Sequence, residues 1–141
     1  MRSPLPAAIA LVLFTLAIAI FGRVTDIGTV RVTTGAAVEV RDLVFKDGPT
    51  GTIHITDARN GAVVEVVESG EDGFIRGSMR GLARERTRHG VGPEVPFRLI
   101  RWESGVVSIS DTGTGQRIYL DAFGPTNVAA FTRLFASEGG R

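Results

Sequence analysis

The chain has 141 residues, which is room for one hydrophobic core of ordinary size and argues against a two-domain enzyme. Its 16 basic and 15 acidic residues give a net charge of +1, so no chain-wide field favours nucleic acid or an acidic substrate. The sequence contains no cysteine, which excludes disulfides, thiolate zinc sites, iron-sulfur clusters and cysteine nucleophiles.

The N-terminal segment is an apolar run from Leu5 to Phe21 without a charged side chain. At about 1.5 Å per residue, a helix of this kind nearly reaches the hydrocarbon thickness of about 30 Å, with Arg2 and Arg23 at its boundaries. The sequence therefore predicts a transmembrane anchor over residues 1–23. A cleaved signal peptide is the alternative, because Ala17 to Ala19 resembles a cleavage site, but the run exceeds the usual length of about 7 to 15 residues.

The charges that flank this run are nearly balanced between its two sides. Arg2 and the free amine on one side face Arg23, Arg31 and Asp26 on the other. An N-terminal anchor with a short leader is more often inserted with its N-terminus in the cytoplasm, which would place residues 24–141 outside it.

One face of the expected anchor carries small side chains. They follow one another at offsets of seven, four and three: Ala8, Thr15, Ala19 and Gly22. Another helix could pack against this face, and the alternative is that alanine is simply abundant in the segment. The run contains no histidine, the usual imidazole ligand of a buried porphyrin or chlorin, so we do not expect this helix to carry pigment.

After a linker over residues 24–37, the chain resembles itself at an offset of 54. The offset pairs residues of the same type: Leu43 with Phe97, Gly51 with Gly105, Ile53 with Val107, Ile55 with Ile109, Asp57 with Asp111, Gly61 with Gly115 and Gly70 with Gly124. Both copies then change from period two to a helical pattern. We predict an α+β domain over residues 38–138, with antiparallel strand-strand-strand-helix units at about 41–90 and 95–136 related by a pseudo-twofold.

Two loops at equivalent places, 57–61 and 111–115, begin with an aspartate and end with a glycine. The aspartate can accept hydrogen bonds from backbone amides, and the glycine can adopt positive φ, so both stretches predict hairpin turns. Neither supplies the alternating oxygen ligands of a calcium site.

The first helix is expected from Asp72 or Gly73 to His89, after an entry rich in caps and negative charge. Its core face is apolar at helical spacing: Ile75, Met79, Leu82 and Ala83. A second stripe recurs every four residues and consists of Arg76, Arg80, Arg84 and Arg88, with Arg86 in addition. These arginines are candidates for contact with lipid headgroups or with acidic surfaces of a partner, and the alternative is a solvated face.

The second helix is expected after Pro125, which the first turn tolerates. Its apolar positions, Val128, Phe131, Leu134 and Phe135, predict a core face. His54 and His89 are the only imidazoles, and neither has the spacing of a metal site or a nucleophile motif. We therefore expect no catalysis, metal, cofactor, nucleic acid or small-molecule substrate.

Several stretches resemble the PuhC-type photosynthetic complex assembly proteins of anoxygenic phototrophic bacteria. They are residues 71–86, Phe97-Arg98-Leu99, Arg101-Trp102 and Ala122-Phe123-Gly124-Pro125-Thr126-Asn127. The resemblance covers about residues 44–134, and the order of anchor, linker and domain matches as well. Ser78 and Thr87 depart from the pattern, where an apolar and a basic residue are expected.

The resemblance implies a non-enzymatic factor that assembles or reorganises the reaction-centre and light-harvesting core complex. Its partners would be the subunits of that complex and membrane lipids. It would reside in the inner photosynthetic membrane as a single-pass protein, with its folded domain on the periplasmic side. A permanently bound structural subunit and a membrane-tethered enzyme of unknown chemistry are the alternatives.

Overall fold

The structure is a computed structural model that describes residues 5–25 and 34–136. The chain divides between residues 33 and 34 into two compact units, which are considered separately. The first contains helix α1 (Leu5–Thr25). The second contains β1 (Ala37–Asp47), η1 (Pro49–Gly51), β2 (Ile53–Asp57), β3 (Val63–Val67), α2 (Gly73–His89), β4 (Phe97–Trp102), β5 (Val107–Asp111), β6 (Arg117–Tyr119), η2 (Leu120–Phe123) and α3 (Pro125–Ala136).

The transmembrane anchor predicted for residues 1–23 is wrong as an element of the fold. Among the helices of residues 5–25 and 34–136, none combines the length and the hydropathy that a membrane span requires. The uncharged run from Leu5 to Phe21 is at the lower limit of the roughly 17 to 25 apolar residues that a helical span uses.

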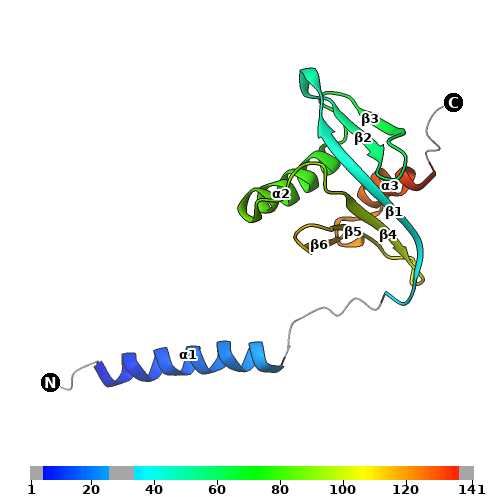
Figure 1. Ribbon diagram of the computed structural model, residues 1–141. Helices are drawn as coiled ribbons and strands as arrows, with labels where there is room; N and C mark the ends of the chain where they lie inside the picture. The colour runs from blue at the N-terminus through cyan, green and yellow to red at the C-terminus, as the bar shows by residue number, and fades with distance from the viewer. Residues whose placement is uncertain (1–4, 26–33, 137–141) are drawn as a thin grey trace. The chain divides into compact units, whose positions relative to one another are not determined.

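The second unit is built on a single antiparallel sheet in the order β3-β2-β1-β4-β5-β6 (Figure 1). β1 and β4 lie at its centre, and each continues outward through a hairpin to the next strand. In β2 the residues Ile53, Ile55 and Asp57 are buried and those between them are half-buried. This alternation is what the period of two in the sequence produces when one face of a sheet is covered.

The register of the sheet is the same in the two hairpins. Leu43 lies opposite Asp57 in the first, and Phe97 lies opposite Asp111 in the second. Leu43 and Phe97 also face each other where β1 pairs with β4. The predicted fold class is corrected in its anchor, and the direct pairing of β1 with β4, which it left open, joins the halves β1–β3 and β4–β6 into one continuous six-stranded sheet.

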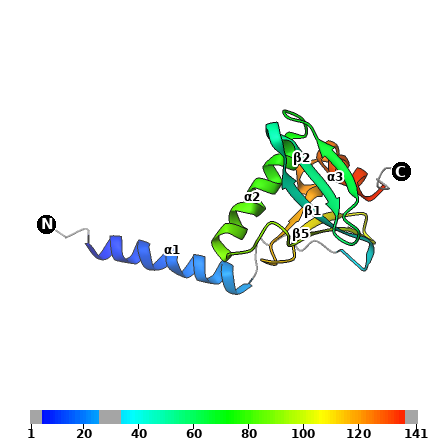
Figure 2. The same ribbon diagram turned by 45° about the horizontal axis from the view of Figure 1, so that its top comes forward.

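Helices α2 and α3 pack on the same face of the sheet. Their apolar residues form one buried cluster with side chains at alternate strand positions, and those at 0% exposure are Leu43, Ile55, Ile75, Leu82, Leu99, Ile109, Leu120, Phe131 and Leu134. Figure 2 shows α2 extending beside the sheet. α2 ends at His89 and is capped by Gly90, whose φ of 66° turns the chain so that the Val91 amide also donates to the Arg86 carbonyl, at 3.0 Å.

Candidate functional site

The predicted arginine row on α2 does not form one uniform surface. Arg76 is half-buried and holds backbone carbonyls of the segments around the start of the helix. Its Nη1 donates to the Gly51 carbonyl at 2.7 Å, its Nε to that of Glu71 at 2.9 Å and its Nη2 to that of Glu68 at 2.5 Å. Arg76 therefore links α2 to the β1–β2 connection and has a structural role.

The other three arginines of the row are exposed. Arg88 Nη1 lies 3.0 Å from Glu85 Oε2, one helical turn away. Arg80 and Arg84 make no hydrogen bond or ion pair within the part of the chain that the structure describes. Their charges remain available to a partner, because an exposed arginine without an internal acceptor loses no bond when a new anion approaches.

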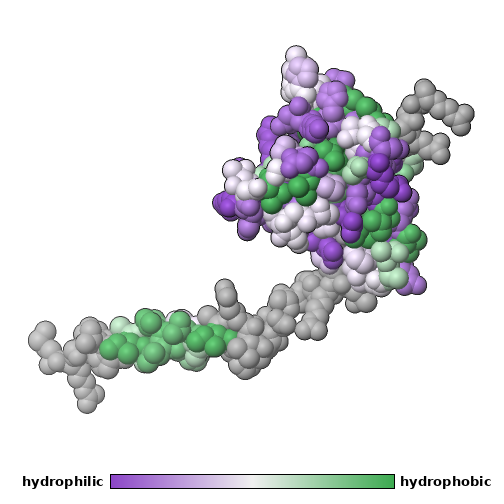
Figure 3. All heavy atoms as spheres, viewed as in Figure 1, coloured by the Kyte–Doolittle hydropathy of each residue, from purple (hydrophilic) through white to green (hydrophobic). Residues whose placement is uncertain are grey.

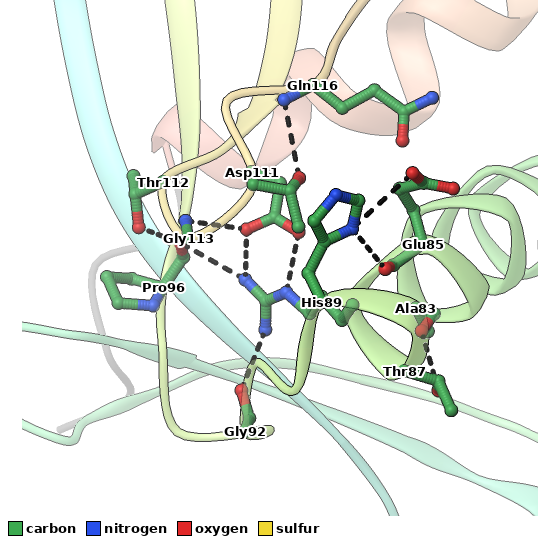
Figure 4. A network of polar contacts seen from close by, with 12 residues as sticks. Ala83, Glu85, Thr87, His89, Gly92, Pro96, Asp111, Thr112, Gly113 and Gln116 are labelled. Carbon is green, nitrogen blue, oxygen red and sulfur yellow. Dashed lines mark hydrogen bonds and ion pairs between the residues drawn. The ribbon is translucent and has the colours of Figure 1, made fainter.

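Arg86, which the sequence only added to the row, is almost completely buried at 5% exposure. Its Nε and Nη2 donate to the two carboxylate oxygens of Asp111 at 2.8 and 2.9 Å, and its guanidinium lies 3.6 Å above the Phe97 ring. Figure 4 shows Asp111 at the centre of this network, with Gly92, Pro96 and Gly113 around it. This bidentate pair fixes the end of α2 to the β5–β6 turn.

The turn aspartates act as predicted, since each accepts a hydrogen bond from a backbone amide two residues further on. Asp57 Oδ1 accepts from the Arg59 amide at 2.9 Å, and Asp111 Oδ1 accepts from the Gly113 amide at 2.8 Å. Arg41 pairs with Asp57 at 3.0 Å, as Arg86 does with Asp111. Both hairpin turns thus begin with a buried carboxylate held by an arginine.

Burial by itself raises the pKa of Asp111, but the hydrogen bonds from Arg86 and from the Gly113 amide outweigh it, so its pKa lies below the usual 3.8. At Asp57 burial is again opposed, here by the Arg59 amide and Arg41, and the pKa is likewise lowered. Both groups are therefore anions at neutral pH, held in place by the fold.

A groove of about 750 Å³ runs between α2 and the β1–β2 connection. We define the α2 groove by its lining residues: Phe45, Lys46, Asp47, Gly51, Ile53, Arg76, Met79, Arg80, Ala83, Arg86, Thr87, Val91, Pro93 and Phe97. The set contains four basic residues and one acidic residue. Of the predicted row, Arg76 and Arg80 line the groove, whereas Arg84 and Arg88 lie outside it.

The residues from the strands that line this groove were not predicted from the sequence. Lys46, at the end of β1, is exposed and makes no polar contact within the described residues. Phe45 and Phe97 meet edge to face with their ring centroids 5.7 Å apart. Only the antiparallel pairing of the strands brings Phe45 and Phe97 together beside α2, so no spacing along the chain signals them. In Figure 3, hydrophobic patches lie among hydrophilic ones on the face of the domain in view.

The predicted small-residue face lies on α1. Ala8 and Thr15 are exposed, and the Thr15 hydroxyl bonds to the Val12 carbonyl at 2.9 Å within its own helix. The side chains of Ala19 and Gly22 lie outside the described residues. The packing role of this face stays a prediction.

The two histidines lie on separate elements, His89 at the end of α2 and His54 on β2. His89 Nδ1 lies 3.0 Å from the Glu85 carbonyl oxygen and 3.5 Å from the Glu85 carboxylate, one turn earlier on α2 (Figure 4). His54 is half-buried on β2. Within residues 5–25 and 34–136, no group of three or more histidine, aspartate or glutamate side chains is placed to hold a metal ion.

These features define an α+β domain with helices on one sheet face and a cationic groove beside the longer helix. Residues 38–138 match the family described as photosynthetic complex reorganisation protein PuhC, and the chain belongs to this family. The predicted resemblance is thereby confirmed.

A relative from Rhodobacter capsulatus, named "Uncharacterized 17.4 kDa protein in puhA 5'region", is 26% identical over 100 residues. The alignment covers 71% of this chain and 60% of the relative, so the chain spans about three fifths of that protein's length. No solved structure matches the chain.

Proposed function

We propose that the protein is a non-catalytic factor in the assembly or reorganisation of the photosynthetic reaction-centre and light-harvesting core complex. The family match supports the process, since the family is described by photosynthetic complex reorganisation. The observation that carries the mode of action is a set of exposed cations on and beside α2 that make no polar contact with the residues that the structure describes: Lys46, Arg80 and Arg84.

Two carboxylates that could perform acid-base chemistry serve the fold in this domain. Asp57 and Asp111 are buried and held by arginines, and a carboxylate with a lowered pKa is a poor proton carrier at neutral pH. Arg80 and Arg84 on α2, in contrast, are exposed. Contact with a partner is therefore the activity that these residues support.

The partners that we propose are acidic segments of reaction-centre and light-harvesting subunits, with lipid headgroups as further contacts. Arginine suits both, because its planar guanidinium pairs with carboxylate and phosphate groups. We further propose that the domain works on the periplasmic side of the photosynthetic membrane. Activity of a reporter enzyme fused after Ala136 would test this location, and activity confined to the cytoplasm would exclude it.

The experiment uses the full chain in a phototrophic host whose own gene is deleted. Arg80, Arg84 and Arg88 are replaced together by glutamine, while Arg76 and Arg86 are kept because the fold needs them. We expect a lower yield of core complex with an unchanged circular dichroism spectrum. A matched control replaces His54 and His89 by glutamine and should assemble normally. Normal assembly in the arginine variant, with failure in the folded histidine control, would refute a contact function.

Co-purification of the tagged chain over the course of assembly decides between a transient factor and a permanent subunit. A transient factor should be present in intermediates and absent from the finished core complex. A permanent subunit should stay at a fixed ratio throughout.

A further inference from the structure

One face of the six-stranded sheet carries neither α2 nor α3. Both helices cover the face of Leu43 and Leu99, so side chains at the alternate positions of β1 and β4 point to the other side. Ile100 agrees with this, because it is buried at 5% exposure but lies outside the core cluster that the helices close. We define the uncovered face by its apolar residues: Val40, Val44, Val63, Val66, Ile100, Trp102 and Tyr119.

The uncovered face exposes apolar surface. Val40 is 47% exposed, Val63 50% and Val66 38%. The indole N–H of Trp102 donates to Ser108 Oγ at 2.9 Å, so this half-buried ring presents carbon atoms and no free donor. In Figure 3, hydrophobic side chains gather over the part of the domain where Figure 1 labels β1 and β4. A contiguous apolar patch of this kind marks an interaction surface.

The two charges at the centre of the uncovered face balance each other. Arg98 donates from Nε and Nη2 to the Asp42 carboxylate at 2.8 and 2.9 Å, and both side chains are partly exposed. Arg117, a further cation of this face, lies on the edge strand β6, away from the rows that β1 and β4 share. A lipid surface is selected by clustered, unpaired cations. A balanced central pair instead suits a surface that presents both signs.

A second copy of the chain is such a surface. Two sheets of the same twist pack face to face about 10 Å apart with their strands nearly aligned. A two-fold axis that runs along the boundary between β1 and β4 exchanges these strands and preserves their rows. It places Asp42 of one copy over Arg98 of the other, twice, and Val40 over Ile100. Opposite charges therefore face each other, and so do apolar residues.

We infer that the uncovered face is a homodimer interface, in which two copies of the domain pack sheet against sheet about this axis. The inference goes beyond the proposed function, because that function uses α2, which lies on the other side of the sheet. The dimer leaves Arg80 and Arg84 exposed in both copies. It thus presents two α2 surfaces, and two linked weak contacts bind more tightly than one.

The size of the uncovered face sets the expected affinity. Six strands about 4.8 Å apart, with about five residues each, cover roughly 29 Å by 17 Å, or about 500 Å² in each copy. The total of about 1,000 Å² is at the lower limit for a specific interface. We therefore expect a weak, reversible dimer, which a crosslinking reagent can trap.

Single cysteines test the geometry, because the chain has no cysteine of its own. In the dimer the two copies of position 40 lie about 11 Å apart, given the spacings of sheets and strands. A bismaleimide of that span should link Val40→Cys chains into a dimer. The purified full chain is used. Exposed apolar residues of α1 could also bring chains together, so the position of the crosslink is the readout.

The matched control is Val63→Cys, which makes the same substitution on the same face at nearly the same exposure, 50% against 47% at Val40. Val63 lies on β3, two strands further from the axis, so its two copies are about 26 Å apart in the dimer. The reagent does not reach across that distance, and the crosslink should be lost.

Charge reversal in the Val40→Cys background tests which strands face each other. Asp42→Arg and Arg98→Asp each set like charges against each other in a homodimer, so the Kd of the dimer should rise at least about tenfold. When the two proteins are mixed, every arginine at these positions meets an aspartate of the other chain, and the crosslink should return. Both side chains are partly exposed, so either variant should fold, which circular dichroism checks.

Two results would overturn the inference. One is no crosslink at position 40, or an equal one at position 63. The other is a mixture of the two charge variants that crosslinks no better than either alone. If position 40 gives no crosslink and Val40→Asp loses binding to vesicles of phosphatidylglycerol and phosphatidylcholine, the uncovered face belongs to lipid. None of these measurements involves core-complex assembly, so the proposed function stands or falls by its own test.

Discussion

The Arg86–Asp111 pair offers the sharpest test of how α2 is held. Replacing Arg86 by methionine leaves an apolar side chain of similar length but removes the guanidinium over Phe97 and both hydrogen bonds to Asp111, whose exposure is 1%. A carboxylate buried without its partner costs about 3 to 5 kcal/mol. The Gly113 amide still donates to Asp111, which favours the lower end of this range. We therefore take a loss of about 3 kcal/mol. For a domain of this size, at about 4 to 8 °C per kcal/mol, the melting temperature should fall by roughly 12 to 24 °C.

Thermal and urea unfolding of the full chain, followed by circular dichroism, would measure this loss. The double variant Arg86→Met, Asp111→Asn removes both charges. The side-chain oxygen introduced at position 111 can still accept the hydrogen bond from the backbone amide of Gly113. The double variant should therefore be more stable than Arg86→Met alone, although less stable than the parent. Arg88→Met, on the exposed side of α2, is the control and should change stability by less than about 0.5 kcal/mol. A double variant less stable than the single one would refute the unpaired buried charge as the cause.

Three further predictions concern the same domain. The pKa values of Asp57 and Asp111 lie below 3.8, so the stability that these carboxylates contribute is complete above about pH 5 and is lost as the pH falls through their pKa values in the folded state. The free energy of unfolding, measured from about pH 7 to about pH 2, should therefore decrease, and it should decrease less in Asp111→Asn. Gly77→Ala and Gly81→Ala should each stabilise α2 by up to about 1 kcal/mol, because a Cβ at either position meets nothing within 4 Å; a lower melting temperature would contradict this. Arg76→Gln should speed amide exchange around Gly51 because it releases that carbonyl, whereas Arg80→Gln should leave exchange there unchanged.

Local chemistry in the sequence determined the elements and the turns. The period of two at Ile53 and Ile55 gives a strand, and the helical spacing after Gly73 gives a helix that ends at His89, as predicted. The aspartates of the two hairpins were also recognisable, because an acceptor at the start of a turn and a glycine at its end satisfy the local backbone. The family was recognisable from residues 71–86 and from three shorter stretches between residues 97 and 127, each continuous in the chain.

The tertiary structure decided which of these residues shape the fold and which face a partner. Arg76, Arg80 and Arg86 have the same side chain on one helix, yet two are held by carbonyls or a carboxylate from other elements and one is exposed. The groove required the pairing of β1 with β4, which no spacing along the chain encodes. The helical period fixes the direction of a side chain, whereas its partner depends on which distant segment packs there.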